Sequence, residues 1–454
     1  MSSPSIRHVL VVALVVRAAV IVSSLMVTGG TIGFINPDTD DYVEPATAFL
    51  ETGTFALGGQ PDITRTPGYP IFLLPGIALG HVEIITLVGQ VLLSCLTVYG
   101  VYRLGLELLG DGRAALLGAC VYAVEPVSIL FSAKVVSETL FTAILVLFLL
   151  AATKYLKEPR WRTIIVAAML LAAAIYVRPI AYYLPALATP FLLVRALVLR
   201  RAARLLAAQA AVFFIVSAGL ISLWHVRNYA ATGYSGFTAN IESNLYYVEA
   251  AQVLAVERGV AFKEMAHRLG YSEELRYQNR PAEFTENKGA HYAAMRRKAL
   301  DIIAEHPLTY LRNRAHAVLR TVLNPGGFEY MVLYDVYPGH RILEAEVLDK
   351  GLMAGAIWML RERTALFWTN IALAVILAII YLCAVMGFVS RRLRLTAPVL
   401  LALMVGAYFV GTSLGSSRFR HPVMPIIAVF AGYGAVCVWV WLRTRWGQGT
   451  LAPG

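Results

Sequence analysis

Residues 36–70 read NPDTDDYVEPATAFLETGTFALGGQPDITRTPGYP and form the first long polar interruption of an otherwise apolar sequence. The stretch holds an acid cluster, a tyrosine and a single arginine, which are Asp38, Asp40, Asp41, Tyr42 and Arg65. A carboxylate can take a proton from an acceptor group, and an arginine can hold a phosphate. Because apolar sequence flanks it, the stretch predicts chemistry at a membrane surface.

The composition excludes an ordinary soluble domain. Hydrophobic residues make up 58% of the 454 residues, charged residues 15%, and the mean hydropathy is +0.65, as in polytopic membrane proteins. The net charge of +11 does not indicate nucleic acid, because the basic residues form short clusters between apolar spans and no reader motif is present. The four cysteines lie in apolar stretches, so neither a disulfide framework nor a metal site is expected.

Apolar stretches of membrane-spanning length predict an all-α protein with about ten transmembrane helices. They are residues 9–28, 82–103, 114–132, 137–153, 163–178, 180–199, 205–224, 365–388, 396–413 and 420–442. The first lacks a small-x-small cleavage site, so it is interpreted as a retained helix, with Arg17 snorkelling toward the cytoplasm.

Charge predicts the orientation of these helices. With the N-terminus inside, every basic cluster falls in a cytoplasmic loop and the C-terminus is cytoplasmic. The clusters are Arg103 and Arg113; Lys154, Lys157, Arg160 and Arg162; Arg195, Arg200, Arg201 and Arg204; Arg391, Arg392 and Arg394; and Arg443 and Arg445. Three regions follow: a transmembrane module (1–224) with its first outward loop (29–81), a small helical extracytoplasmic region (225–364), and C-terminal transmembrane helices (365–454). Within the second region, an amphipathic helix pair should break at His306-Pro307.

Five basic residues are exceptions to this orientation because they face outward: Arg65, Lys134, Arg178, Arg418 and Arg420. Such exceptions favour a specific anionic partner. The alternative is pairing with the chain's own acids, Asp38, Asp41 or Glu138.

Several motifs follow one another in a suggestive order. They are Asp38-x-x-x-Tyr42, Arg65-x-Pro-Gly-Tyr69-Pro, Ser137-Glu-Thr-Leu-Phe141, an Arg-Pro at Arg178, Trp224-x-x-Arg-Asn-Tyr-x-x-x-Gly233, and Arg418-x-Arg-x-Pro-x-x-Pro425. This succession resembles the GT-C glycosyltransferases. More narrowly it resembles their bacterial family 39, which contains protein mannosyltransferases and the aminoarabinose transferase of lipid A.

The resemblance implies an inverting glycosyltransferase that moves a hexosyl or pentosyl group from a polyprenyl-phosphate donor. The reaction would take place on the outer face of the bacterial cytoplasmic membrane, with a glycan, lipid or protein as acceptor. Asp38 is the expected base, with Asp41 and Glu138 as further catalytic candidates. The expected phosphate-binding residues are Arg65, Tyr69, Lys134, Arg178, Arg227, Arg418 and Arg420. Asp40, Tyr42 and His421 are expected to orient the acceptor.

Alternatives remain open at several of these positions. Asp40 and Asp41 could cap a helix, although Pro45 favours a helix that starts nearer itself and leaves the aspartates in irregular backbone. Glu138 could pair with Lys134 four residues earlier, orient the acceptor, or bind a divalent cation such as Mg or Mn. Asn228 is expected to cap the C-terminus of its own helix. His421 is expected to pack against neighbouring side chains and not to bind a ligand. For the whole chain, a lipid-linked sugar flippase or a non-catalytic envelope-assembly protein stays an alternative.

Overall fold

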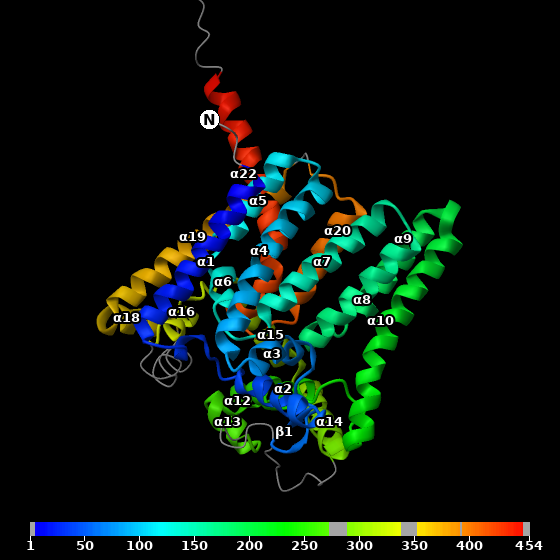
Figure 1. Ribbon diagram of the computed structural model, residues 1–454, viewed down its shortest axis with the longest axis vertical. Coiled ribbons are helices and arrows are strands. Elements are labelled where there is room, and N and C mark those ends of the chain that lie inside the picture. The colour runs from blue at the N-terminus through cyan, green and yellow to red at the C-terminus, as the bar shows by residue number, and fades with distance from the viewer. Residues whose placement is uncertain (1–4, 272–287, 337–351, 391–392, 448–454) are drawn as a thin grey trace, which may run out of the picture.

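The computed structural model describes residues 5–271, 288–336, 352–390 and 393–447, and these residues are almost entirely helical. Figure 1 shows a bundle of long helices with a layer of shorter helices at one end. The single strand pair is an antiparallel hairpin of β1 (Ala56–Leu57) and β2 (Gln60–Pro61) within the described residues. The all-α fold predicted from the sequence is confirmed.

The bundle contains the apolar helices. They are α1 (Ile6–Thr28), α4 (Val82–Leu109), α5 (Gly112–Ala123), α6 (Pro126–Ser132), α7 (Glu138–Lys157), α8 (Trp161–Val177), α9 (Leu184–Val198), α10 (Ala203–Thr232), α19 (Thr364–Phe388), α20 (Ala397–Gly411) and α22 (Met424–Gly447). Each predicted stretch coincides with one or more of them. The chain is therefore a multi-pass membrane protein.

The predicted number of about ten spans is approximate, because some of the apolar helices are short. Seven helices of the described chain are long and apolar enough to cross a membrane, or eight if α5 and α6, bent by 56°, form one span. The helices α8, with 17 residues, and α20, with 15, are apolar but short. The difference arises because hydropathy alone does not reveal where a helix begins and ends.

Arg17 fills the break between α5 and α6 and does not snorkel, so that expectation was wrong. Its side chain is fully buried and donates hydrogen bonds to Ala123 O at 2.8 Å, Ala13 O at 3.1 Å and Ser94 Oγ at 2.7 Å. Because a broken helix leaves carbonyls without partners in an apolar medium, a buried guanidinium stabilises the break.

A second group of shorter elements lies outside the bundle. They are η1 (Ile32–Phe34), α2 (Asp40–Thr52), α3 (Gly68–Ala78), η2 (Pro179–Ala181), η3 (Arg200–Ala202), α11 (Asn240–Asn244), the π-helical turn η4 (Leu245–Ala250), α12 (Ala251–Arg258), α13 (Phe262–Arg268), α14 (Lys288–Glu305), α15 (Pro307–Leu323), α16 (Gly327–Leu333), α18 (Leu352–Glu362), α21 (Ser417–Arg420) and η6 (His421–Val423). As predicted, a helix pair breaks at His306-Pro307.

We call α2, the hairpin, α11, η4, α12, α13 and α14 the helical cap. In Figure 1, α2, β1, α12, α13 and α14 gather at the lower end of the bundle. Part of the cap has its own core, in which Tyr234, Tyr246, Tyr247, Tyr292 and Met295 are buried. The cap therefore has a hydrophobic core of its own in addition to its contacts with the bundle.

Helix α2 begins at Asp40, and not near Pro45 as expected. The N–H groups of Tyr42 and Val43 both donate to Thr39 O at 3.0 Å, which closes the first turn ahead of the proline. Pro45 removes only one intrahelical hydrogen bond, and the carboxylates of Asp40 and Asp41 favour the helix N-terminus. Asp38 alone of the three aspartates lies before the helix, in a turn.

Candidate active site

Arg65 joins two of the aspartates. Its Nη2 lies 2.8 Å from Asp38 Oδ1 and 2.6 Å from Asp41 Oδ2, and its guanidinium carbon is 4.8 Å from the centre of the Tyr42 ring. The carboxylate of Asp62 accepts the N–H of Thr64 at 2.7 Å and that of Arg65 at 3.2 Å. This turn between the hairpin and α3 directs Arg65 toward α2.

Arg418 extends the cluster from the other end of the chain. It lies on the four-residue helix α21, where Ser416 Oγ accepts its backbone N–H at 3.3 Å. Its guanidinium binds Asp38 Oδ2 through Nη1 and Glu138 Oε1 through Nε. Arg178, which follows α8, binds the same oxygen of Glu138. Three arginines and three carboxylates therefore form one connected network.

Glu138 is the buried centre of this network. It opens α7, its side chain is 0% exposed, and Ser137 before it accepts a hydrogen bond from Arg178 at 3.3 Å. The hydroxyl of Tyr42 also lies 3.3 Å from Ser137 Oγ. The alternative pairing of Glu138 with Lys134 does not form, because Lys134 pairs with Glu329 while Arg178 and Arg418 bind Glu138.

The network fixes the protonation state of Asp38. Burial raises the pKa of this carboxyl, but the charges of Arg418 and Arg65 and their hydrogen bonds outweigh burial and hold the pKa well below its usual range. Asp38 is therefore ionised at neutral pH while both arginines are bound to it.

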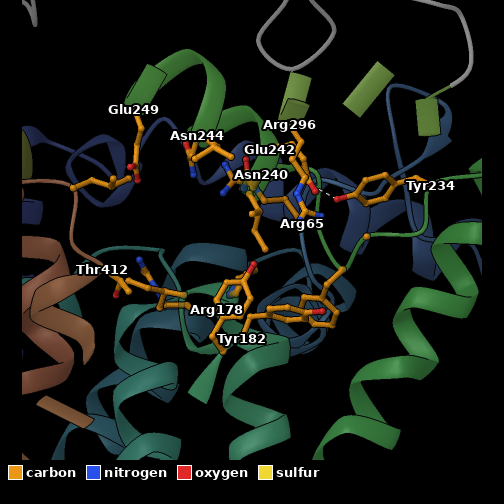
Figure 2. Close-up of a pocket in the computed structure, with 18 of the residues that line it drawn as sticks. Arg65, Arg178, Tyr182, Tyr234, Asn240, Glu242, Asn244, Glu249, Arg296 and Thr412 are labelled. Carbon is orange, nitrogen blue, oxygen red and sulfur yellow. Dashed lines mark hydrogen bonds between the residues drawn. The ribbon is translucent and has the colours of Figure 1, made fainter. Parts of the chain in front are cut away.

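The network opens into a cavity of about 950 Å³ between the bundle and the cap. Asp38, Tyr42, Arg65, Arg178 and Arg418 line it on the bundle side. Figure 2 shows Arg178 and Tyr182 on one side of this space, with Asn240, Asn244 and Glu249 across from them on the cap. Distant parts of the sequence thus meet around one polar chamber.

The remaining predicted residues lie outside the cavity lining. Tyr69 is buried beneath it, donates to Gln90 Oε1 at 2.9 Å and packs edge-on against Tyr42 at 4.9 Å. Lys134 is fully buried and pairs with Glu329 at 2.8 Å, which joins α16 to the bundle. Asp40 is exposed on the first turn of α2.

Arg227 and Asn228 hold the cap in place. Helix α10 continues to Thr232, so both lie within it; Arg227 donates to Asp62 O and, at 2.6 Å, to Phe55 O, and covers the Trp224 ring at 4.7 Å. Asn228 donates to the carbonyls of Gly236 and Phe237, both at 3.0 Å. Asn228 therefore binds the following loop and not the end of its own helix.

Arg420 and His421 also have partners within the protein. Arg420 donates to Thr321 O at 3.0 Å and Val322 O at 3.3 Å, so it caps the C-terminus of α15. His421 Nδ1 lies 3.0 Å from Thr142 Oγ1, and its ring packs on Phe131 at 5.3 Å. The prediction that His421 packs within the protein agrees with these contacts.

No group of three or more His, Cys, Asp or Glu residues suited to a metal ion occurs in the part of the chain that the structure describes. The carboxylates of the network all face arginines. A divalent cation at this site stays a prediction.

Sequence reasoning did not assign the cap side of the cavity. The cap side is lined by Tyr234, Asn240, Glu242, Asn244, Glu249 and Arg296, and Tyr182 lines the opposite side. The polar, aromatic run from Tyr234 to Glu249 was visible in the sequence. It carries no spacing typical of a known site, so only the folded cap reveals that it faces Asp38.

Comparison with known proteins supports the resemblance predicted from the motifs. Residues 64–222 match the family described as "Dolichyl-phosphate-mannose-protein mannosyltransferase". No curated protein matches the sequence. This family match lies within the N-terminal half of the chain and includes Arg65, Glu138 and Arg178.

Solved structures give weaker likenesses. The chain is 14% identical to the oligosaccharyltransferase AglB from Archaeoglobus fulgidus in complex with an inhibitory peptide and a dolichol-phosphate (TM-score 0.49; 96% of this chain, 52% of that one). It is 15% identical to ArnT from Cupriavidus metallidurans in the apo state (TM-score 0.40; 93% and 76%), and 14% identical to ArnT bound to undecaprenyl phosphate (TM-score 0.38; 98% and 81%). The chain spans about half the length of the AglB chain.

The fold and the charged cavity define a multi-pass membrane protein with a polar site at one end of its helix bundle. Residues 64–222, about a third of the chain, are similar to the protein mannosyltransferase family.

Proposed function

We propose that the chain is an inverting glycosyltransferase that moves a monosaccharide from a polyprenyl-phosphate donor to an envelope acceptor. The single observation that supports this most is the joining of Asp38, Arg65, Arg418, Glu138 and Arg178 at the cavity. The carboxylates can accept a proton and the guanidinium groups can hold a phosphate. Transfer from a lipid phosphate requires both.

In the proposed reaction, the acceptor oxygen attacks C1 of the sugar from the face opposite the phosphate. The new C–O bond forms as the bond from C1 to the phosphate oxygen breaks, and the configuration at C1 inverts. The acceptor proton passes to the carboxylate of Asp38. The departing electron pair remains on the polyprenyl phosphate, which Arg65, Arg178 and Arg418 stabilise.

Donor binding would also strengthen the base. A phosphate competes with Asp38 for Arg65 and Arg418, and those two arginines are what hold the pKa of Asp38 low. Once they turn toward the phosphate, the effect of burial, which raises the pKa, is left with less opposition. A base with a higher pKa accepts the proton of a hydroxyl more readily.

The distribution of basic residues supports a location in the bacterial cytoplasmic membrane with both termini inside and the cavity outside. The acceptor would be a lipid, an envelope polysaccharide or a protein hydroxyl. A divalent cation, Mg or Mn, is proposed only as an addition to the arginines, with Glu138 as its nearest candidate ligand.

Purified wild-type protein in liposomes with radiolabelled polyprenyl-phosphate sugars and envelope extract tests the proposal. We expect release of polyprenyl phosphate and a product whose anomeric configuration, measured by NMR, is opposite to that of the donor. Movement of the intact donor across the bilayer without cleavage would favour a flippase. No turnover with any donor would favour an assembly protein.

A further inference from the structure

The cavity has two walls of different chemistry. The bundle side presents three guanidinium groups, on Arg65, Arg178 and Arg418. The cap side presents amide, carboxyl and phenol groups on α11, η4 and the loop before them. Arg296 and Arg297 of α14 also line the cap side. A ligand that fills this space therefore meets mainly guanidinium groups at one end and a mixture of amide, carboxyl, phenol and guanidinium groups at the other.

A π-helical turn builds the cap wall. Asn240 and Asn244 lie one α-helical turn apart on α11, and Glu249 follows five residues later on the π-helical turn η4. In a π-turn the residue five positions on lies over the first, whereas in an α-helix it would be the fourth. The turn thus places Glu249, and not Val248, in the cavity lining with the two asparagines.

The acidic groups of this wall are held in place by partners behind them. Arg314 of α15 reaches Glu249 Oε1 at 3.3 Å and donates to Gly411 O at 2.6 Å, which links the wall to the end of α20. The hydroxyl of Tyr234 donates to Glu242 Oε2 at 2.7 Å. Burial raises the pKa of Glu242. Such fixed groups can orient a ligand with little rearrangement.

Tyr182, on the bundle side of the cavity, presents a directed hydroxyl. His225 Nδ1 lies 2.7 Å from Ser235 O, which can only accept, so Nδ1 carries the proton. The other ring nitrogen, Nε2, then accepts from the Tyr182 hydroxyl at 3.0 Å. With its proton committed to His225, the Tyr182 oxygen is left as an acceptor beside the cavity.

We propose that Asn240, Asn244 and Glu249 form a subsite that binds the hydroxyl groups of the donor's monosaccharide. Amides and a carboxylate beside tyrosine rings suit a ring that carries several hydroxyls. The class of ligand is therefore a monosaccharide with several free hydroxyl groups. This inference rests on the proposed function, since the phosphate of the same donor lies at the arginines.

Binding measured without any acceptor tests the subsite. The probes are undecaprenyl phosphate and its mannose, glucose and galactose conjugates, added to wild-type protein, Asn244→Ala and Asn240→Ala in detergent. Asn244 is exposed, so its truncation should leave the fold intact. Gln252→Ala is the matched control, because Gln252 lies on the next helix and is not in the cavity lining.

We expect at least one conjugate to bind wild-type protein and Gln252→Ala about tenfold more tightly than undecaprenyl phosphate alone. Asn244→Ala and Asn240→Ala should lose that advantage and bind undecaprenyl phosphate as before. An advantage that survives in both variants, or that no conjugate shows, would overturn the subsite. If wild-type protein did not bind undecaprenyl phosphate at all, the proposed function itself would fail.

Discussion

Arg418 binds the carboxylate of Asp38 although 380 residues separate the two in the sequence. Each oxygen of Asp38 faces a different arginine, Arg418 at Oδ2 and Arg65 at Oδ1. The segment between α1 and α2 and the segment before α22 are thereby joined at one point. This point lies in the lining of the cavity between bundle and cap.

Truncation of Arg418 should impair turnover more than folding. We expect Arg418→Ala to lower the rate of polyprenyl-phosphate release by about 100-fold or more, because one fixed donor to the leaving group is lost. Arg418→Lys should recover only part of it, since an ammonium cannot reproduce the fork of the guanidinium. Arg394→Ala, an exposed arginine in the loop before α20, serves as the control and should keep full activity. Equal rates for Arg418→Ala and wild type would remove Arg418 from the site.

Neutralising Glu138 should destabilise the protein. The carboxylate is 0% exposed and binds both Arg178 and Arg418, so Glu138→Gln leaves two guanidinium groups without their shared counter-charge. Breaking a buried pair in this way costs about 3–5 kcal/mol. Thermal unfolding in detergent should show a clear loss for Glu138→Gln and almost none for the exposed control Asp40→Asn. Similar melting temperatures for the two variants would contradict the buried network.

The pair of Lys134 and Glu329 should prove structural. Lys134→Met should lower the melting temperature, because Glu329 is left partly buried without its partner. The double variant Lys134→Met/Glu329→Leu should recover most of that loss, since a buried pair replaced by apolar groups is often neutral. Neither change should alter the KM for the donor by more than about twofold, because Lys134 and Glu329 bind each other outside the cavity lining. A large rise in KM for Lys134→Met would return Lys134 to the phosphate site.

Acid should weaken the contribution of Asp38 to stability. Its folded pKa lies below its unfolded pKa, so the stabilisation is fully present above the ordinary value of 3.8 and is lost as the pH falls below it toward the folded pKa. The difference in unfolding temperature between wild type and Asp38→Asn should therefore be constant from about pH 5 to 7 and shrink below about pH 4. A difference that grows on acidification would mean that the arginines do not hold Asp38 ionised.

The sequence was sufficient for much of the fold because long apolar stretches and basic clusters are local signals. It also singled out Arg65, Arg178 and Arg418, because each falls where the predicted topology disfavours a basic residue. The structure brings these three side chains to one cavity. The sequence could not separate these three from Lys134 and Arg420, because that choice depends on partners far along the chain, Glu329 and the carbonyls after α15.

The cap wall and Arg17 show the same limit. Asn240, Asn244 and Glu249 share a face only because a π-helical turn follows α11, and no residue pattern predicts that turn. In the sequence, Arg17 has the pattern of a snorkelling residue. In the structure, the helix break after Ala123 exposes a buried carbonyl that Arg17 binds. Sequence periodicity describes one helix at a time. The cap wall and the Arg17 contacts both depend on how one helical segment meets another.

The most direct test of the account compares Asp38→Asn with Asp40→Asn under single-turnover conditions, using the wild-type donor that gives the fastest release of polyprenyl phosphate. Both variants remove one carboxylate near the start of α2, but of these two residues only Asp38 faces the arginines and the cavity. We predict that Asp38→Asn slows release by about 100- to 10,000-fold, the range for loss of a positioned base, while Asp40→Asn keeps the wild-type rate. Unchanged release by Asp38→Asn would contradict the account.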